Sequence, residues 1–531
     1  MLCAHRIPQH MKNSLFIDSY IKHKHKLIFL VIIIIGACLR FYQVFNSMPW
    51  ADDAGRDLLV AKHLVDHSAP LWSSPTASGT TFLNNTPMYF WLVGLFYFFG
   101  RSVSFVMISF ASMGVVTVVL AYTLGKTLRG TFMGLTLASL VSLSYITIIP
   151  SRSILQPNLT GMLIMATLIF YTQFHRSKSF YDGLLLVVSM FAGIALHLGY
   201  LPVFTFFSIA LVWELSRAQR LHKSLIIFIV YYVALFFWAL MYIKIPSLRA
   251  FFNLPVPIDR AEYLQNMGFG LLNFSNYLFF GAPMIIKIIL GEVALVMLFV
   301  KPIPGYVKKM SPFVFFSAIF WINALLCVCL VYGNSAPYYY YDAFYVITLV
   351  GFAVLIERII PIKIKILLAT LFIVGTAYST KAMITYEPRK EYVSALIAST
   401  RIIEDYKKYD DHAGQEYNFW VVAAQGDYPG IFGMFSEQYW YVLETLVKKE
   451  LTIIVNGSQN SRPIVLSPRF IYLICKVGEF YFVSADQCVT QMATHYPYDF
   501  TRFINPTTID NIVVPYFTLH IIRFENTVRA K

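Results

Sequence analysis

The stretch LIFLVIIIIGACLRFYQVF, residues 27–45, is predominantly apolar, and the acidic sequence ADDAGRDLLVAKHL, residues 51–64, follows shortly after it. A run of about 20 apolar residues is long enough to cross the hydrocarbon core of a bilayer as a helix. The first stretch therefore predicts a retained transmembrane helix. The acidic sequence is then expected to lie just beyond the membrane boundary.

The composition extends this interpretation to most of the chain. Of 531 residues, 57% are hydrophobic and only 13% are charged, which is far more apolar than soluble domains of this length require. We predict a polytopic α-helical membrane protein with about eleven spans. The candidate spans are 27–45, 102–125, 131–149, 159–174, 180–198, 200–216, 223–243, 283–300, 311–331, 343–357 and 364–381.

The distribution of basic residues predicts the orientation. The apolar segment 87–99 is short and begins with proline, and treating it as a span would place most of the basic clusters outside. If it does not span, the inside segments carry more than twice as many lysines and arginines as the outside loops. We therefore predict a cytoplasmic tail at 1–26, a transmembrane domain at 27–381 and a long external loop at 46–101. The net charge of +14 then reflects orientation, and no nucleic-acid motif accompanies it.

By parity, residues 382–531 are expected outside the cytoplasm as a small α/β domain. Helical periodicity after Lys381 is followed by the strand candidates NFWVVAA and FIYLICKV, with the helix candidate SEQYWYVLETLVKK between them. Cys475 and Cys488 are the two cysteines of this region. An external compartment would permit a disulfide between them, and two buried free thiols are the alternative, because spacing alone does not establish the geometry.

The acidic pair Asp52–Asp53 allows three interpretations. A carboxylate at the outer interface can act as a general base toward a hydroxyl, coordinate a cation, or stabilise the start of a helix. Stabilisation of a helix start is a serious alternative, because the sequence continues with an apolar stripe of helical spacing. The residues alone leave these alternatives open.

A resemblance favours the first interpretation. The first helix, the external acidic pair opening an amphipathic helix, and the sequences NNTPMYFWLVGLFYFFG and PSRSILQPNLTGMLIMATLIFY resemble the lipid-dependent GT-C glycosyltransferases. Their nearest branch is the protein O-mannosyltransferase and aminoarabinose-transferase group, glycosyltransferase family 39 and its relatives. The resemblance is clearest over residues 27–200 and weaker, by helix pattern, to about 381.

The resemblance implies roles for four residues. Asp52 corresponds by position to the catalytic base of the family, with Asp53 as a supporting acid. Arg152, in the second external loop, corresponds to an arginine that binds the donor phosphate; the alternative is an interfacial arginine that anchors a helix end. Arg56 is expected either to bind phosphate or to keep the acidic pair ionised.

Weaker candidates face the same compartment. His197 and Tyr200 lie at the outer end of a helical hairpin, where a lone histidine is more often structural. Tyr339, Tyr340 and Asp342 belong to the last external loop, where tyrosines form an aromatic belt or contact a sugar.

Two departures from the family pattern bear on the site. Thr86 precedes Pro87 where aminoarabinose transferases have a lysine, so a second phosphate-binding cation is in doubt. Gln156, Pro157 and Asn158 occupy the stretch where relatives often have an aspartate. We therefore expect no metal site and no required cofactor, with room only for a weakly bound divalent cation.

The sequence thus predicts a membrane glycosyltransferase of the GT-C type. It would transfer one sugar from a polyprenyl-phosphate donor to an external protein, lipid or envelope glycan by inverting displacement. The rivals are a transporter or flippase for a lipid-linked sugar and a polysaccharide polymerase or ligase. A transporter would predict charged groups deep in several helices and internal repeats, and neither is clear here.

Overall fold

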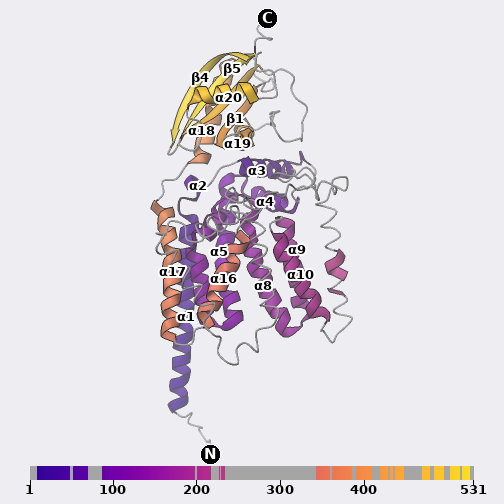
Figure 1. Ribbon diagram of the computed structural model, residues 1–531, viewed down its shortest axis with the longest axis vertical. Coiled ribbons are helices and arrows are strands. Elements are labelled where there is room, and N and C mark those ends of the chain that lie inside the picture. Colours follow the sequence, from indigo (N-terminus) through magenta and orange to yellow (C-terminus); the bar gives the residue numbers. More distant parts are fainter. Residues whose placement is uncertain are drawn as a thin grey trace, which may run out of the picture. The chain divides into compact units, whose positions relative to one another are not determined.

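The structure is a computed structural model, shown in Figure 1. It describes residues 9–47, 52–69, 87–197, 200–216, 226–227, 229–233, 342–358, 362–385, 390–409, 419–428, 431–434, 437–447, 469–478, 484–495, 503–514 and 517–526. The chain divides into two compact units. The helical unit comprises 1–42, 111–151 and 156–385, and the loop-and-sheet unit comprises 43–110, 152–155 and 386–531.

The helical unit consists of long helices that run alongside one another (Figure 1). Its described helices are α1 (Gln9–Phe41), the later part of α5 (Val103–Arg129), α6 (Thr131–Leu143), α7 (Tyr145–Ile148), α8 (Thr160–Ser177), α9 (Phe180–Leu196), α10 (Leu201–Ser216), α16 (Asp342–Arg358) and α17 (Ile362–Thr385). Helix α6 packs against α1, α16 and α17, while α8 packs against α9 and α16. Helices α8, α9, α10, α16 and α17 therefore lie close to predicted segments, while α1 begins at Gln9, well before the predicted start at residue 27.

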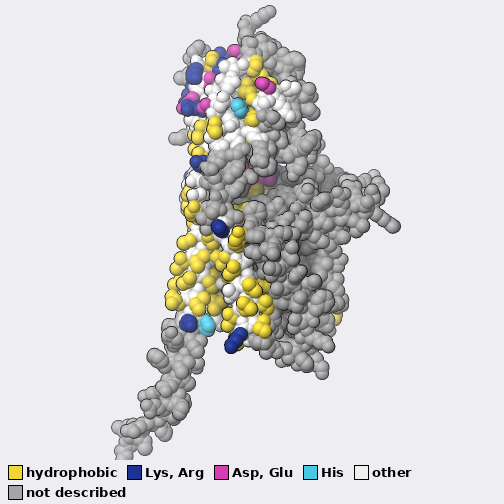
Figure 2. Space-filling view, turned by 60° about the vertical axis from the view of Figure 1, so that its left-hand side comes forward, with side chains coloured by type: hydrophobic (Ala, Val, Ile, Leu, Met, Phe, Trp, Pro, Cys, Tyr) yellow, Lys and Arg dark blue, Asp and Glu magenta, His cyan; other side chains and the backbone are white. Residues whose placement is uncertain are grey.

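The outer surface of this unit is apolar. Large hydrophobic side chains of α1, such as Leu27 and Ile34, and of α17, such as Leu367 and Val374, are exposed. Figure 2 shows hydrophobic side chains covering this face and basic ones at one end of it. Among the described residues, Lys24–Asn46 and Val103–Arg129 are each long and apolar enough to cross a membrane. A surface of this kind is stable only against lipid, so the chain is an integral membrane protein.

One predicted span differs from expectation. The run 131–149 is continuously apolar and was predicted as a single helix, but the structure bends it by 77° between α6 and the segment Tyr145–Arg152. Ser144, at the break, has an extended backbone with φ −76° and ψ 126°. The cause lies in bonds from other helices, which are described below.

The loop-and-sheet unit is built on a five-stranded sheet. Its strands are β1 (Phe419–Tyr428), β2 (Ile431–Met434), β3 (Phe470–Gly478), β4 (Phe503–Val514) and β5 (Phe517–Asn526), in the order β2-β1-β3-β5-β4. Strand β1 pairs with β3 in parallel, and the other neighbours pair antiparallel. Central strand β3 is buried along most of its length, as its unbroken apolar sequence predicts.

Helices cover this sheet. Helix α18 (Glu391–Lys407) contacts β4 and β5, and α20 (Ala485–His495) contacts β3 and β1 (Figure 1). Buried Asp405 of α18 accepts hydrogen bonds from Tyr472 Oη at 3.0 Å and from Arg523 Nη1 at 2.7 Å. This cluster joins α18 to two strands of the sheet. The predicted α/β character of the region is therefore observed, with β1, β3, α18 and α19 (Glu437–Val447) at the predicted places.

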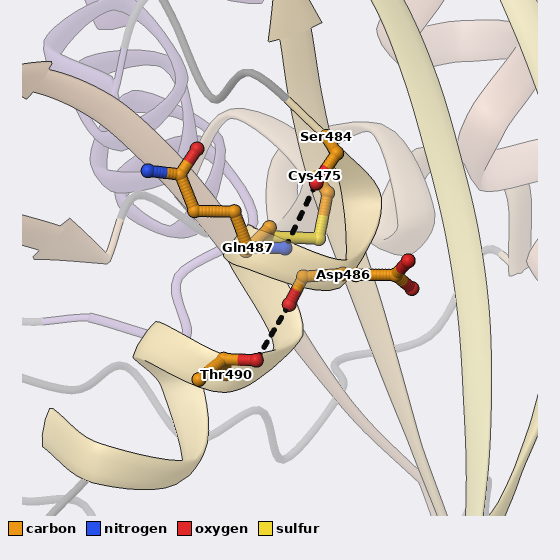
Figure 3. The surroundings of a disulfide bond; sticks show 6 residues. Cys475, Ser484, Asp486, Gln487 and Thr490 are labelled. Atoms are coloured by element: carbon orange, nitrogen blue, oxygen red, sulfur yellow. Dashed lines mark hydrogen bonds between the residues drawn. A yellow bond between two sulfur atoms is a disulfide. The ribbon is translucent and has the colours of Figure 1, made fainter.

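The two cysteines of this unit form a disulfide, which the sequence left open. Cys475 lies on β3 and Cys488 on α20, with their Cα atoms 6.1 Å apart. Figure 3 shows Ser484 at the start of α20, where its hydroxyl accepts a hydrogen bond from the backbone N–H of Gln487 at 3.1 Å. The disulfide and this cap together fix α20 on the sheet.

Replacing Cys488 should measure the contribution of the disulfide. The bond closes a sequence separation of 13, for which the loss of loop entropy in the unfolded chain corresponds to about 3 kcal/mol. We expect Cys488→Ser to lower the free energy of unfolding of this unit by about that amount, measured by unfolding in detergent. The control is Cys38→Ser, since Cys38 is an exposed free cysteine. Equal stability of the two variants would show that the disulfide contributes nothing.

The same unit also contains the beginning of the chain's first loop. Helices α2 (Val44–Ser47), α3 (Asp52–Val65) and α4 (Pro87–Gly100) belong to it, and the backbone N–H of Lys390 donates to the carbonyl of Asn46 at 3.0 Å. Helix α4 is 14 residues long and apolar, and whether it crosses the membrane stays a prediction.

Candidate functional site

Helix α3 carries the acidic pair at its first two residues, Asp52 and Asp53. Carboxylates in the first turn stabilise a helix because they face the unpaired N–H groups and the positive end of the helix dipole. The apolar stripe predicted from the sequence is buried, with Ala54, Leu58 and Ala61 each fully inaccessible to solvent. The acidic pair is therefore held at the start of a helix whose opposite face is fixed in a core.

Two helices pack against α3. Helix α4 begins with Pro87, a residue suited to the first helical position, and α19 comes from the C-terminal region (Figure 1). Tyr97 of α4 and Tyr441 of α19 also contact each other edge to face, with ring centroids 6.5 Å apart. Helix α3, which carries the acidic pair, thus packs against α4 and against α19 of the C-terminal domain.

A buried ionic cluster joins α3 to α19. Glu444 of α19 is completely buried, and its Oε2 lies 2.9 Å from His63 Nε2 and 3.2 Å from Lys62 Nζ. Lys62 also faces Asp66 at 3.7 Å. The partners lie 381 and 382 positions apart in the sequence. A completely buried carboxylate that contacts both Lys62 and His63 favours one arrangement of the two helices.

Arg56 lies between two carboxylates. Its Nη1 is 2.6 Å from Asp53 Oδ1, and both Nε and Nη2 donate to Asp57 Oδ1, at 3.0 and 2.7 Å. The guanidinium therefore ties Asp53 to the buried Asp57 of the same helix. Both predicted roles of Arg56, binding phosphate or pairing with the acidic residues, stay predictions.

Asp57 is the buried carboxylate of the three charged residues Asp53, Arg56 and Asp57. Its side chain is inaccessible to solvent and interacts with the hydroxyl of buried Tyr89 on α4. Burial raises the pKa of the Asp57 carboxyl to about 7, and the charge of Arg56 offsets this only in part. The same burial, together with the charge of Asp57, raises the pKa of Tyr89. Asp57 is therefore poised to hold or release a proton near neutral pH.

This raised pKa predicts a pH-dependent stability. Since the folded pKa lies above the unfolded value of 3.8, the folded state binds the extra proton between about pH 4 and 7. Stability should therefore fall as pH rises through this window, by on the order of 1 kcal/mol per pH unit. Asp57→Asn should remove that component, seen as a flatter dependence of the unfolding midpoint on pH between 5 and 8. The same pH dependence in wild type and variant would contradict the assignment.

Arg152 is the last residue of the short 3-10 helix Pro150–Arg152, and so the last residue of the bent segment Tyr145–Arg152. Its side chain is only 2% exposed, so it does not act as a solvent-facing anchor. Residues 152–155 cluster with the loop-and-sheet unit rather than with the helices before and after them. The structure thus brings Arg152 and the acidic pair, which lie about 100 positions apart, into one unit.

The remaining residues predicted for the site belong to the helical unit or lie outside the described residues. Tyr200 is completely buried, and its hydroxyl lies 2.5 Å from Thr167 Oγ1 inside the helical unit, so it packs between helices and does not face a substrate. His197 ends α9 and is half-buried. Asp342 begins α16, while Tyr339 and Tyr340 lie outside the described residues. Across the described ranges there is also no group of three or more potential metal ligands.

The sequence interpretation treated Asp57 only as a neighbour of the pair. One signal was available: Asp57 lies three residues after Ala54, one before Leu58 and four before Ala61, so it shares the apolar stripe. A carboxylate on the stripe of an amphipathic helix must be buried. The Glu444 cluster had no comparable local signal.

Comparison with known proteins adds the fold. No family model and no curated protein matches the chain. Two crystal structures of ArnT, the aminoarabinose transferase of Cupriavidus metallidurans, are similar at 10% identity, each over 93% of this chain and 97% of that one. The TM-scores are 0.54 for ArnT bound to undecaprenyl phosphate and 0.57 for apo ArnT. The oligosaccharyltransferase of Archaeoglobus fulgidus is more distant, with 12% identity, 80% and 61% coverage and a TM-score of 0.47. The chain therefore has the GT-C fold, as the sequence resemblance implied.

Proposed function

We propose that this protein is a membrane glycosyltransferase that moves a single sugar from a polyprenyl-phosphate donor to an extracytoplasmic acceptor. The observation that carries the proposal is the acidic pair at the start of α3, whose second member Asp53 pairs with Arg56, in one compact unit with Arg152. A base and a phosphate-binding cation are the two groups that such a transfer needs. The GT-C fold supports it, since one similar structure is ArnT bound to undecaprenyl phosphate.

The location of the pair suits a lipid-linked donor. A polyprenol tail stays in the bilayer, so the reacting anomeric carbon is presented at headgroup depth. Asp52 begins α3 five residues after the end of α2, in the loop that follows the first membrane-spanning helix. A carboxylate in that position meets the sugar without entering the hydrocarbon core.

The chemistry is a single inverting displacement. Asp52 takes the proton of the acceptor hydroxyl while the hydroxyl oxygen forms a bond to the anomeric carbon. The bond from that carbon to the phosphate oxygen breaks, and the polyprenyl phosphate leaves with the electron pair. Arg152 stabilises the negative charge that develops on this phosphate. Asp53 and Arg56 fix the charge and direction of the helix start.

The C-terminal domain is proposed to recognise the acceptor. Its helix α19 packs against α3, the helix that begins with the acidic pair, and Glu444 contacts the last turn of α3. The acceptor is a protein, a lipid headgroup or an envelope glycan. The amino terminus is proposed to be cytoplasmic, with residues 46–101 and 382–531 outside and about eleven spans overall.

We also propose that the reaction needs no metal ion. The stretch Gln156–Pro157–Asn158 offers no carboxylate where related enzymes often have one, so divalent cations would bind weakly at most. Addition of a chelator to the purified protein should leave the transfer rate unchanged. A rate that falls with chelator and returns with Mg²⁺ or Mn²⁺ would contradict this.

The test is transfer by the purified protein in lipid nanodiscs. Undecaprenyl-phosphate sugars carrying a radiolabelled hexose, pentose or aminoarabinose are supplied with envelope lipid, peptide or glycan acceptors. We expect the label to move from the lipid to one acceptor class with inversion at the anomeric carbon. If instead the label crosses the bilayer of proteoliposomes still attached to the lipid, with no acceptor labelled, the protein is a flippase and the proposal fails.

A further inference from the structure

Arg40, near the end of α1, is the largest side chain of the helical unit that is completely buried. Its hydrogen-bond partners are uncharged: Nη1 donates to the carbonyls of Gly36 and Ser142, and Nη2 donates to those of Val141 and Thr147. The ion pairs found among the described residues do not include Arg40. A cation at membrane depth is costly, so its position requires a physical reason.

The reason lies at the bend between α6 and α7. A helix that ends inside a membrane protein leaves carbonyl oxygens without intrahelical partners, and no water is present to satisfy them. At this break Arg40 bonds to the carbonyls of Val141 and Ser142 at 3.1 and 3.3 Å, and Thr380 of α17 bonds to that of Leu143 at 2.5 Å. Ser144 O accepts from the backbone of α7. Every carbonyl from Val141 to Ser144 therefore has a donor.

The charge of Arg40 also suits this place. The C-terminal end of α6 carries the negative end of the helix dipole, which stabilises a cation that bonds to the last carbonyls. Gly114 of α5 provides the space: a Cβ there would lie 2.8 Å from Arg40 Nε and 2.3 Å from Ser151 Cβ. Arg40 and Ser151 therefore pack against the same point of α5, and Arg152 follows directly in the chain.

We propose that Arg40 is a positioning residue, a cap that stabilises the break after α6 and thereby fixes the segment Tyr145–Arg152 in the bent direction that delivers Arg152 to the donor phosphate. The step from Arg152 to the phosphate rests on the proposed function. The capping itself does not, because it follows from the bonds of Arg40 alone. Arg40 touches neither substrate nor reacting atoms.

The variants separate capping from simple loss of folding. Arg40→Lys keeps the charge but cannot reach both Val141 and Ser142, and Arg40→Met keeps the length without donors. Thr380→Val removes the neighbouring bond to Leu143, and Thr380→Ser, which retains the hydroxyl, is its matched control. Arg152→Ala serves as the reference for loss of the phosphate contact itself.

Three measurements are made in nanodiscs: amide hydrogen exchange of residues 144–152, the dissociation constant for undecaprenyl phosphate, and the separate kcat and KM of transfer. For Arg40→Lys we expect faster exchange in this segment, and donor KM and dissociation constant raised on the order of tenfold, with a smaller change in kcat. A merely structural defect would lower the active fraction and hence kcat, leaving KM unchanged.

The outcomes are distinguishable. If Arg40→Lys and Arg40→Met show wild-type exchange over 144–152, the capping proposal is wrong whatever the activity. If exchange rises but the affinity for undecaprenyl phosphate stays at the wild-type value, the link from Arg40 to donor binding is wrong. If the wild-type protein binds no undecaprenyl phosphate at all, the proposed function fails, while faster exchange in the variants still supports the cap.

Discussion

Asp52→Asn should lower the rate of sugar transfer by roughly 10²–10⁴, the contribution that a positioned general base commonly makes. The amide is nearly the same size as the carboxylate but cannot accept the hydroxyl proton. Binding of undecaprenyl phosphate should not change, because that contact belongs to Arg152 in the proposed mechanism. The loss should therefore appear in kcat, measured with labelled donor at saturating acceptor.

The structure offers a matched control at the other end of the same helix. Asp66 lies just beyond the last turn of α3, with a side chain 39% exposed, and pairs with Arg101 at 2.7 Å. Asp66→Asn removes a carboxylate of the same kind without touching the acidic pair, so its transfer rate should match wild type. Asparagine is as good as aspartate at the start of a helix, so Asp52→Asn should fold normally. An unchanged rate in Asp52→Asn would exclude it as the base.

Elements set by local pattern could be predicted from the sequence. Helices α8, α9, α10, α16 and α17 fall on the predicted apolar segments to within a few residues, since a helix in lipid satisfies its own backbone and needs only length and hydrophobicity. Strands β1 and β3 likewise stand out as short apolar runs within a polar domain. Strand β4 was missed, because polar residues at Thr507, Asp510 and Asn511 interrupt its apolar pattern, and β5 was missed with it.

The bend after α6 could not be predicted, because the apolar run 131–149 continues through it. The backbone leaves the helix at Ser144, where donors from Arg40 and Thr380, about 100 residues before and 240 residues after, replace lost helical bonds together with the nearby hydroxyl of Thr147. A hydropathy profile contains no such information. The same reasoning explains Tyr200, whose position near a predicted helix end gave no sign that its hydroxyl would meet Thr167 in the core.

The residues of the candidate site also fall into those that the sequence predicts and those that it does not. Its outer members, Asp52 and Asp53, could be found because acidic residues directly after an apolar span are unusual. Its supports, Asp57 beside Tyr89 and Glu444 beside His63, depend on how α3 packs between α4 and α19. These contacts join segments far apart in the chain, so only the folded arrangement shows that the helix carrying the proposed base is held from the C-terminal domain.

Glu444→Ala should destabilise the loop-and-sheet unit by about 3–5 kcal/mol, because it removes the buried carboxylate that His63 and Lys62 contact. His63 is 3% exposed, and the Lys62 side chain is 13% exposed. We expect a lower unfolding midpoint in detergent and faster amide hydrogen exchange in both α3 and α19. Transfer should fall as well, since the helix that carries Asp52 loses a contact of its last turn with α19.

Two further variants test whether the charge of Glu444 or the packing of α19 against α3 accounts for the loss of stability. Glu404 of α18 is paired with Arg401 at 2.9 Å, but its side chain is 54% exposed, so Glu404→Ala should cost no more than about 1 kcal/mol. Replacing both buried partners, His63→Leu with Glu444→Leu, should recover part of the lost stability, because the His63–Glu444 contact is removed from both sides and Lys62 keeps Asp66 as a partner. If Glu444→Ala costs as little as Glu404→Ala, the cluster does not hold α3. If the double variant is as unstable as Glu444→Ala, the shape of the α3–α19 contact, and not its charge, positions the acidic pair.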